Sequence, residues 1–406
     1  MPRTPRFAIS SLILVASAVA QAVVAFGANL IMVRHLDPAQ FGHFAVVQAS
    51  AALVLSVLSI RANTLIIRTL EAELDAPRRD LLFSVIGWET ILASLLITVL
   101  MVSAGNTQWT DWCLVLALVI GHWTNQNRAF FERGLRFGAL AVIETAVQIS
   151  GHGLAVILVL TGIGAGSLYL RELFFTLGGL AALIGIGAIS FYRFHWVGWS
   201  QWRAVLRDGR GVWLDAMLEN SFSRLTLLLV NANTGLSGAG LFFQAQRLAM
   251  VPQQVLQPIS GRVAGAWFGQ TECHGQRRLM RRRLLLVTAP PLALAAILAW
   301  ALADPVVPWI FGAPWAPAAP ILAALAGMIL FLPLFETLRS EVVASKRVRW
   351  LLVARLAQYG GLLIPLWPVL MGESVDATHL GLALSAAYAG AFVVLAALVL
   401  RFDARA

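Results

Sequence analysis

A short polar run interrupts an otherwise apolar stretch of the sequence around residue 247. Because its small and polar residues recur every three or four positions, they would share one face of a helix. These residues are Gly240, Gln244, Arg247, Val251, Gln254 and Pro258. A guanidinium keeps its charge and donates paired hydrogen bonds, which suits a phosphate group. We expect Gln244, Arg247 and Gln254 to line a wet cavity that binds an anion. The alternative is an arginine held by neighbouring carbonyl groups for structure alone.

Three more arginines lie inside apolar segments, where a charged side chain costs at least about 2.5 kcal/mol to insert. Arg224 lies near the middle of the segment 213–233, where its side chain is furthest from water. Arg61 and Arg355 lie closer to the ends of their segments, where a long side chain can reach the interface. All three join Arg247 as candidates for binding the anion.

Acidic residues in the same kind of segment are candidates for coupling to an ion. Asp215 and Glu219 are four residues apart and would be neighbours on a helix. Glu219 could titrate as a proton site, and a structural ion pair with Arg224 is an equal alternative. Asp215 lies close to the segment end and could simply face water. Glu144, which shares a helix face with His152, is the third candidate.

Other polar residues in the apolar segments favour a structural interpretation. Glu89 and His122 lie in separate segments, and Glu144 shares a third segment with His152. A histidine with a glutamate in a membrane could relay protons, so His122 and His152 are both candidates. A lone buried histidine is more often part of hydrogen-bonded packing, so packing is our default for both. Arg171 and Glu172 are adjacent near a segment start, which is typical of an interfacial anchor.

The composition defines the class of protein that must position these residues. The chain is 59% hydrophobic and 12% charged, whereas soluble domains contain about 25% charged residues. Twelve apolar segments are each long enough to cross a bilayer as a helix. They are 8–33, 44–66, 81–104, 112–131, 138–160, 168–191, 213–233, 239–262, 284–303, 317–336, 350–371 and 379–400. The first is too long for a signal peptide, so we expect an uncleaved span. The sequence predicts an all-α polytopic membrane protein.

The distribution of basic residues predicts the orientation of these spans. With the N-terminus in the cytoplasm, the inner loops hold most of the arginines, including those in "GQRRLMRRR" at 275–283, and the outer loops hold only Arg34. This asymmetry follows the positive-inside rule. We expect a bacterial inner-membrane protein with both termini cytoplasmic. The net charge of +10 then reflects topology and contact with membrane lipids rather than binding to nucleic acid.

The sequence offers little for an enzyme or a cofactor. Cys113 and Cys273 fall at opposite membrane faces and have no metal-ligand or redox spacing. The predicted outer loops are too short to form a catalytic domain, and no phosphate-binding glycine loop is present. We expect no catalytic residues, no metal and no cofactor.

The chain divides into two similar halves. We expect a six-helix lobe at 1–195, a cytoplasmic interfacial linker at 196–212 and a second six-helix lobe at 213–406. A shift of 198 residues aligns Gly42 with Gly240. It also aligns Phe44 with Phe242 and Gln48 with Gln246. An even number of spans per half makes these parallel repeats, which in transporters enclose a central substrate cavity.

Two stretches carry a family resemblance. "VRHLDPAQFGHFAVVQA" at 33–49 and "WIFGAPWAPAAPILAAL" at 309–325 resemble polysaccharide repeat-unit flippases of the multidrug/oligosaccharidyl-lipid/polysaccharide superfamily. The resemblance implies a fold like that of the MATE (multidrug and toxic compound extrusion) transporters. It also implies translocation of a polyprenyl-diphosphate-linked oligosaccharide across the inner membrane by alternating access. The product would serve surface or exopolysaccharide synthesis, whose enzymes would be partners.

Two alternatives belong to other functional classes. A multidrug/cation antiporter of the same superfamily would need an acidic cavity, yet the segment 8–33 contains no acidic residue. A membrane glycosyltransferase or polymerase would need catalytic groups at the membrane face, where no acidic pair stands out. Both are weaker than the flippase interpretation.

Overall fold

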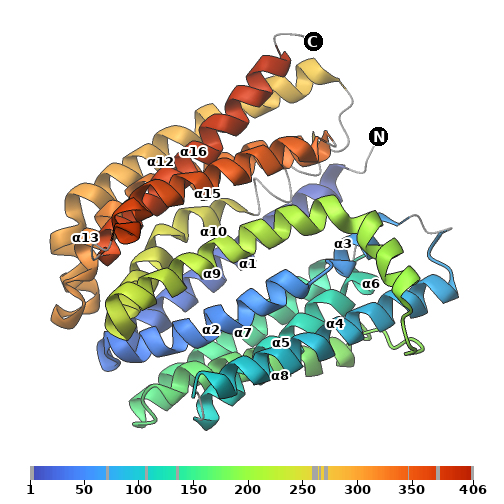
Figure 1. Ribbon diagram of the computed structural model, residues 1–406, viewed down its shortest axis with the longest axis horizontal. Helices are drawn as coiled ribbons and strands as arrows, with labels where there is room; N and C mark the ends of the chain where they lie inside the picture. Colours follow the sequence, from blue (N-terminus) through green and yellow to red (C-terminus); the bar gives the residue numbers. More distant parts are fainter. Residues whose placement is uncertain are drawn as a thin grey trace. The chain divides into compact units, whose positions relative to one another are not determined.

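The computed structural model describes residues 4–69, 73–105, 108–133, 137–257, 264, 267–268, 273–345, 347–371 and 375–403. Within these ranges the regular structure is helical and contains no strand (Figure 1). In the described part of the chain seven helices are long and apolar enough to cross a membrane, or eight if the bent pair α13 (Ala318–Ala324) and α14 (Ala326–Ala344) is one span. Each of the twelve predicted segments overlaps a helix or consecutive helices, although the segment 168–191 extends beyond the end of its helix at Gly185 and the segment 239–262 extends beyond the described residues. The prediction of an all-α polytopic membrane protein is confirmed.

The chain forms two compact units. The first consists of Met1–Ile13, Val23–His35 and Val47–Leu225, and the second of Leu14–Ala22, Leu36–Val46 and Thr226–Ala406. The helices of the N-terminal part are α1 (Thr4–His35), α2 (Pro38–Leu58), α3 (Ala62–Arg68), α4 (Ala76–Ser103), α5 (Trp109–Asn127), α6 (Ala129–Glu132), α7 (Phe137–Leu160) and α8 (Gly166–Gly185). The C-terminal helices are α9 (Trp199–Ala249), α10 (Val251–Gln257), α12 (His274–Phe311), α13 (Ala318–Ala324), α14 (Ala326–Ala344), α15 (Val348–Leu370) and α16 (Ala377–Asp403).

The predicted second span, 44–66, is not one continuous helix. Helix α2 ends at Leu58 and α3 begins at Ala62. Between them Arg61 adopts a left-handed conformation with φ 61° and ψ 44°. Among the described residues it is the non-glycine residue with positive φ. The left-handed region costs an L-residue roughly 1–2 kcal/mol, so the surrounding structure must hold this break in place.

Helix α9 joins two predicted spans. Its backbone departs from helical geometry at Gly235, where φ is 71° and ψ is −175°, a conformation that glycine adopts readily. The predicted segments 213–233 and 239–262 are therefore separated by a one-residue break rather than by a loop. At its other end α9 begins at Trp199, so most of the segment 196–212 is helical and continuous with the span that follows.

An extended strap connects α8 to α9. Residues 188–198 are not helical, and their backbone is bonded to side chains of α4 and α5. Asn127 exchanges two hydrogen bonds with the backbone of Ser190, at 2.8 and 2.9 Å. The hydroxyl of Ser84 accepts from the His195 amide at 3.0 Å, and the indole of Trp88 donates to the His195 carbonyl at 3.1 Å. The strap is thereby fixed to the first unit.

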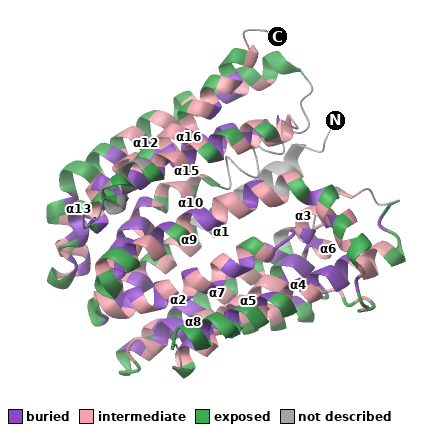
Figure 2. Ribbon diagram, in the orientation of Figure 1, coloured by how far each residue is buried: buried purple, intermediate pink, exposed green. Residues whose placement is uncertain are grey.

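In the second unit, α14, α15 and α16 pack around one apolar cluster that includes Phe335, Leu351 and Leu395. The bend between α13 and α14 is held by Ser385 of α16, whose hydroxyl donates to the Ala324 carbonyl at 2.7 Å. Helix α12 exposes apolar side chains along much of its length, as the exposed colouring in Figure 2 shows. Exposed apolar surface of this kind is what a lipid-facing helix requires.

Candidate functional site

A polar cavity lies within the first unit, inside the range 47–225. Its volume is about 380 Å³, within the usual range for small-molecule sites. Helix α2, the break after it, α5, α8 and α9 all contribute to its wall. The polar lining residues are Ser56, Ser59, Arg61, His122, Asn125, Glu172, Thr176, Asn220 and Arg224.

The helix break that carries Arg61 is held by side chains from other helices. The Ile60 amide donates to Glu89 Oε2 at 3.0 Å, and the Asn63 amide donates to Gln126 Oε1 at 2.9 Å. Gln126 also donates to the hydroxyl of Ser59 at 2.8 Å. Non-helical backbone at membrane depth is tolerated where it is buried in protein or lines a cavity, because its polar groups then find partners. Both conditions hold here.

A histidine–glutamate pair adjoins this break. His122 Nε2 lies 2.7 Å from Glu89 Oε1, and the side chains are 13% and 1% exposed. His122 lines the cavity, and Glu89 is buried beside it. The two oxygens of Glu89 thus have different partners, one the imidazole and the other the Ile60 amide.

The charges around the cavity favour an anion. Arg61 and Arg224 both line it, and Glu172 is the acidic residue in its lining. Glu172 already accepts a hydrogen bond from Arg171 at 2.7 Å. The Arg171 guanidinium is buried and lies 5.7 Å from the ring centre of Phe175. Two arginines therefore face a cavity whose carboxylate is already paired.

The predicted candidates of the first unit are partly brought together. Arg61 and Arg224 share the cavity. Asp215 is buried and Glu219 half-buried on α9, before Arg224. Glu144 forms an ion pair with Arg128 at 2.8 Å, with 37% of its side chain exposed. A role for these three acids in ion coupling stays a prediction.

The predicted polar face falls in the second unit and is not continuous. The helix is interrupted between Ala249 and Val251, and Gly240 packs against the backbone of α2. Gln244 is buried and Gln254 is exposed, whereas Arg247 lies 5.7 Å from the ring centre of Phe243. Pro258 lies outside the described residues. Binding by Gln244, Arg247 and Gln254 stays a prediction.

In the second unit, the buried side chain of Arg355 is held by contacts with neighbouring side chains. Its guanidinium donates to Gln358 Oε1 at 2.9 Å and lies 3.8 Å from Glu336 Oε1. It also stacks 4.7 Å from the ring centre of Phe335 and is 1% exposed. These contacts account for the buried charge, and a role in binding stays a prediction.

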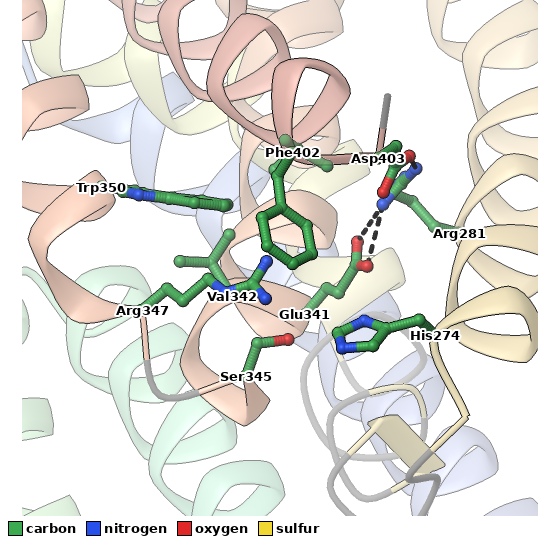
Figure 3. A pocket seen from close by; sticks show the side chains of 10 residues that line it. His274, Arg281, Glu341, Val342, Ser345, Arg347, Trp350, Phe402 and Asp403 are labelled. Carbon is green, nitrogen blue, oxygen red and sulfur yellow. Dashed lines mark hydrogen bonds and ion pairs between the residues drawn. The ribbon is translucent and has the colours of Figure 1, made fainter. Parts of the chain in front are cut away.

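A second charged cluster lies at the ends of α12, α14 and α16 (Figure 3). Arg281 donates to both oxygens of Glu341, at 2.8 and 3.0 Å, and also to Asp403. The Arg347 guanidinium lies over the ring of Phe402. The space between these residues is about 10 Å³, about that of a single water molecule. These ion pairs join the helices to one another, and the space between them is too small for a substrate.

The sequence matches a known protein family. A family described as "Polysaccharide biosynthesis protein" matches residues 31–320. The chain belongs to this family. It is also 31% identical over 198 residues to the succinoglycan biosynthesis transport protein ExoT of Rhizobium meliloti (strain 1021). That match covers 48% of this chain and 39% of the length of the relative.

Solved structures share the fold. The lipid II flippase MurJ in an inward closed conformation matches with a TM-score of 0.72 and 14% identity, over 96% of this chain and 87% of that one. An inward-facing multidrug resistance MATE family transporter matches with a TM-score of 0.63 and 15% identity, over 97% and 98%. These similarities confirm the predicted MATE-like fold.

Proposed function

We propose that this chain moves a lipid-linked oligosaccharide, joined to its lipid by a diphosphate, across a membrane by alternating access. The observation that carries the proposal is the cavity of the first unit, where Arg61 and Arg224 face the same space. A diphosphate diester carries two negative charges that persist at any physiological pH. Two guanidinium groups match that charge and donate to its oxygens in pairs.

The rest of the cavity lining suits a sugar. Ser56, Ser59, Asn125 and Asn220 supply hydroxyl and amide groups that both donate and accept hydrogen bonds. At about 380 Å³ the cavity has room for the diphosphate and the first sugar, so the remaining sugars would lie beyond it. Membership of a polysaccharide biosynthesis family and the likeness to a succinoglycan transport protein support this substrate class.

The membrane setting is part of the proposal. The arginine-rich segments predicted on one side favour a bacterial inner membrane with both termini in the cytoplasm. The chain would receive its substrate from the enzymes that assemble the oligosaccharide there. Its role is transport rather than catalysis.

A multidrug/cation antiporter is the second candidate, since MATE transporters share the fold. The cavity charges oppose it. Arg61 and Arg224 would repel an organic cation, and Glu172 is already paired with Arg171. The flippase is therefore the function that the site supports best.

The test is lipid extraction from the host after deletion of this gene. We expect a diphosphate-linked oligosaccharide to accumulate and the wild-type gene to relieve the accumulation. Arg224→Gln should fail to relieve it at normal protein level. Arg207→Gln is the matched control, because Arg207 is an exposed arginine of the same helix. Unchanged lipids together with unchanged surface polysaccharide would contradict the proposal.

A further inference from the structure

We infer that His122 is a third, switchable cation of the cavity, so that binding of the anionic substrate and protonation of His122 strengthen each other. The inference deepens the proposed function and rests on it, because it takes the anion to be a diphosphate. It assigns His122 and Glu89 a role that the default of structural packing does not give them.

The geometry defines which atom titrates. Glu89 Oε2 accepts the Ile60 amide proton at 3.0 Å, which requires an oxygen with a free lone pair. With Glu89 ionised, His122 Nε2 carries a proton and donates it to Oε1 across 2.7 Å, both when the ring is neutral and when it is doubly protonated. Nδ1 is then the nitrogen that gains or loses a proton. The imidazole stays bonded to Glu89 while its charge changes.

Four charged side chains from different elements act on His122. Glu89 of α4 favours the protonated ring, because the two are in contact. Arg61 from the helix break and Arg224 of α9 line the same cavity and oppose protonation, whereas Glu172 of α8 favours it. In the empty cavity these effects oppose one another.

An anion in the cavity changes this balance. Its negative charge offsets Arg61 and Arg224 and attracts a proton to His122. Linkage is reciprocal, so the protonated ring must strengthen anion binding by the same factor. For one linked proton, the dissociation constant should rise by up to about tenfold per pH unit where the ring titrates. Substrate and proton therefore bind and leave together.

The pair of Glu89 and His122 also affects the position of Arg61. Glu89 bonds the amide of Ile60, the residue directly before Arg61. Loss of the Glu89 charge would weaken both the hold on the helix break and the attraction for the proton on His122. The imidazole bonds Glu89 Oε1, whereas the other oxygen, Oε2, holds the break. Removal of His122 should therefore abolish the proton linkage and leave the anion site formed.

The experiment is calorimetric titration of the purified full-length protein with a farnesyl-diphosphate-linked monosaccharide. The diphosphate of this probe is esterified at both ends, so each phosphorus keeps one strongly acidic group that does not titrate near neutral pH. Titrations between pH 5.5 and 8 in two buffers of different ionisation enthalpy count the protons taken up. We expect the wild type to take up a substantial fraction of one proton per probe bound. We expect His122→Gln to bind without proton uptake and with an affinity that no longer depends on pH.

Controls separate the possible outcomes. His379→Gln, at an exposed histidine outside the cavity, should keep the wild-type proton uptake. Probe binding without proton uptake in the wild type would overturn this inference alone, and so would full uptake in His122→Gln. Absence of probe binding at every pH would contradict the proposed function as well.

Discussion

Gly42 and Gly240 meet backbone to backbone where α2 crosses the second part of α9. A methyl group on Gly42 would lie 1.8 Å from the carbonyl oxygen of Leu236, and one on Gly240 would lie 1.8 Å from that of Pro38. The shift of 198 residues that aligns the two glycines also aligns Pro38 with Leu236. The contact is therefore reciprocal, as a two-fold relation between repeats would produce.

Substitution at this crossing should destabilise the protein. Because the obstacle is a backbone carbonyl rather than a movable side chain, Gly42→Val and Gly240→Val must push the helices apart. Overpacking of this kind costs about 1–3 kcal/mol. The melting temperature of each variant should fall well below that of Gly153→Val, a control at an exposed helical glycine with open space around it. Equal melting temperatures would show that the crossing is not tight.

Arg61→Gly should separate the charge of Arg61 from its backbone conformation. Glycine adopts positive φ without penalty, so this variant should be as stable as the wild type or more stable by about 1 kcal/mol. It removes a cation from the cavity, so binding of a diphosphate diester should weaken at least tenfold. Thermal unfolding and calorimetric binding test the two parts. Arg61→Ala is the companion variant, which should lose both stability and binding.

Arg281 should be essential for stability in the second unit. Its side chain is 6% exposed and neutralises Glu341 and Asp403, which are themselves 10% and 14% exposed. Removal of one partner from a buried ion pair costs about 3 kcal/mol or more. We expect Arg281→Ala to lower the melting temperature strongly. The neighbouring Arg282→Ala, at an exposed arginine, should have little effect.

Asp376 should give α16 a stability that depends on pH. Partial burial would raise the pKa of its carboxyl, but hydrogen bonds from the His379 amide and ring and from the Thr378 amide outweigh it and hold the pKa below its ordinary value of 3.8. The stabilisation is therefore complete above that value and is lost as the pH falls through the lower, folded-state value.

The measurement is the difference in melting temperature between the wild type and Asp376→Ala. Loss of an N-terminal cap costs about 1 kcal/mol, so a clear difference is expected from pH 5 to 7. It should shrink below about pH 4, where the free carboxyl already begins to take up protons. A difference that stays constant down to pH 3 would contradict the assignment.

The helices were predictable because long apolar runs have few alternatives. The break at 59–61 was not, because Ser59, Ile60 and Arg61 include neither glycine nor proline and the apolar pattern continues across them. The break is specified by Glu89 and Gln126, which come from other helices. Tertiary hydrogen bonds of this kind leave no local signal in the sequence.

The candidate site was predictable only in part. The cost of burying a charge identified Arg61 and Arg224, and the structure brings them together. Periodicity alone predicted a polar face that includes Gly240, a residue that packs against the backbone of α2. The recurrence of small and polar residues does not distinguish a cavity wall from a helix crossing. His122 and Glu89 stand out in the sequence as polar residues of apolar segments, but their contact depends on how α4 and α5 pack.

The hydrogen bonds around the helix break also have an evolutionary consequence. Glu89 and Gln126 accept hydrogen bonds from the amides of Ile60 and Asn63, and Gln126 also donates to the hydroxyl of Ser59. A change in one of these residues would therefore leave a buried polar group without its partner. These residues should therefore be inherited as a set. Relatives that replace the glutamate should carry an unbroken second span and place their cavity arginine elsewhere.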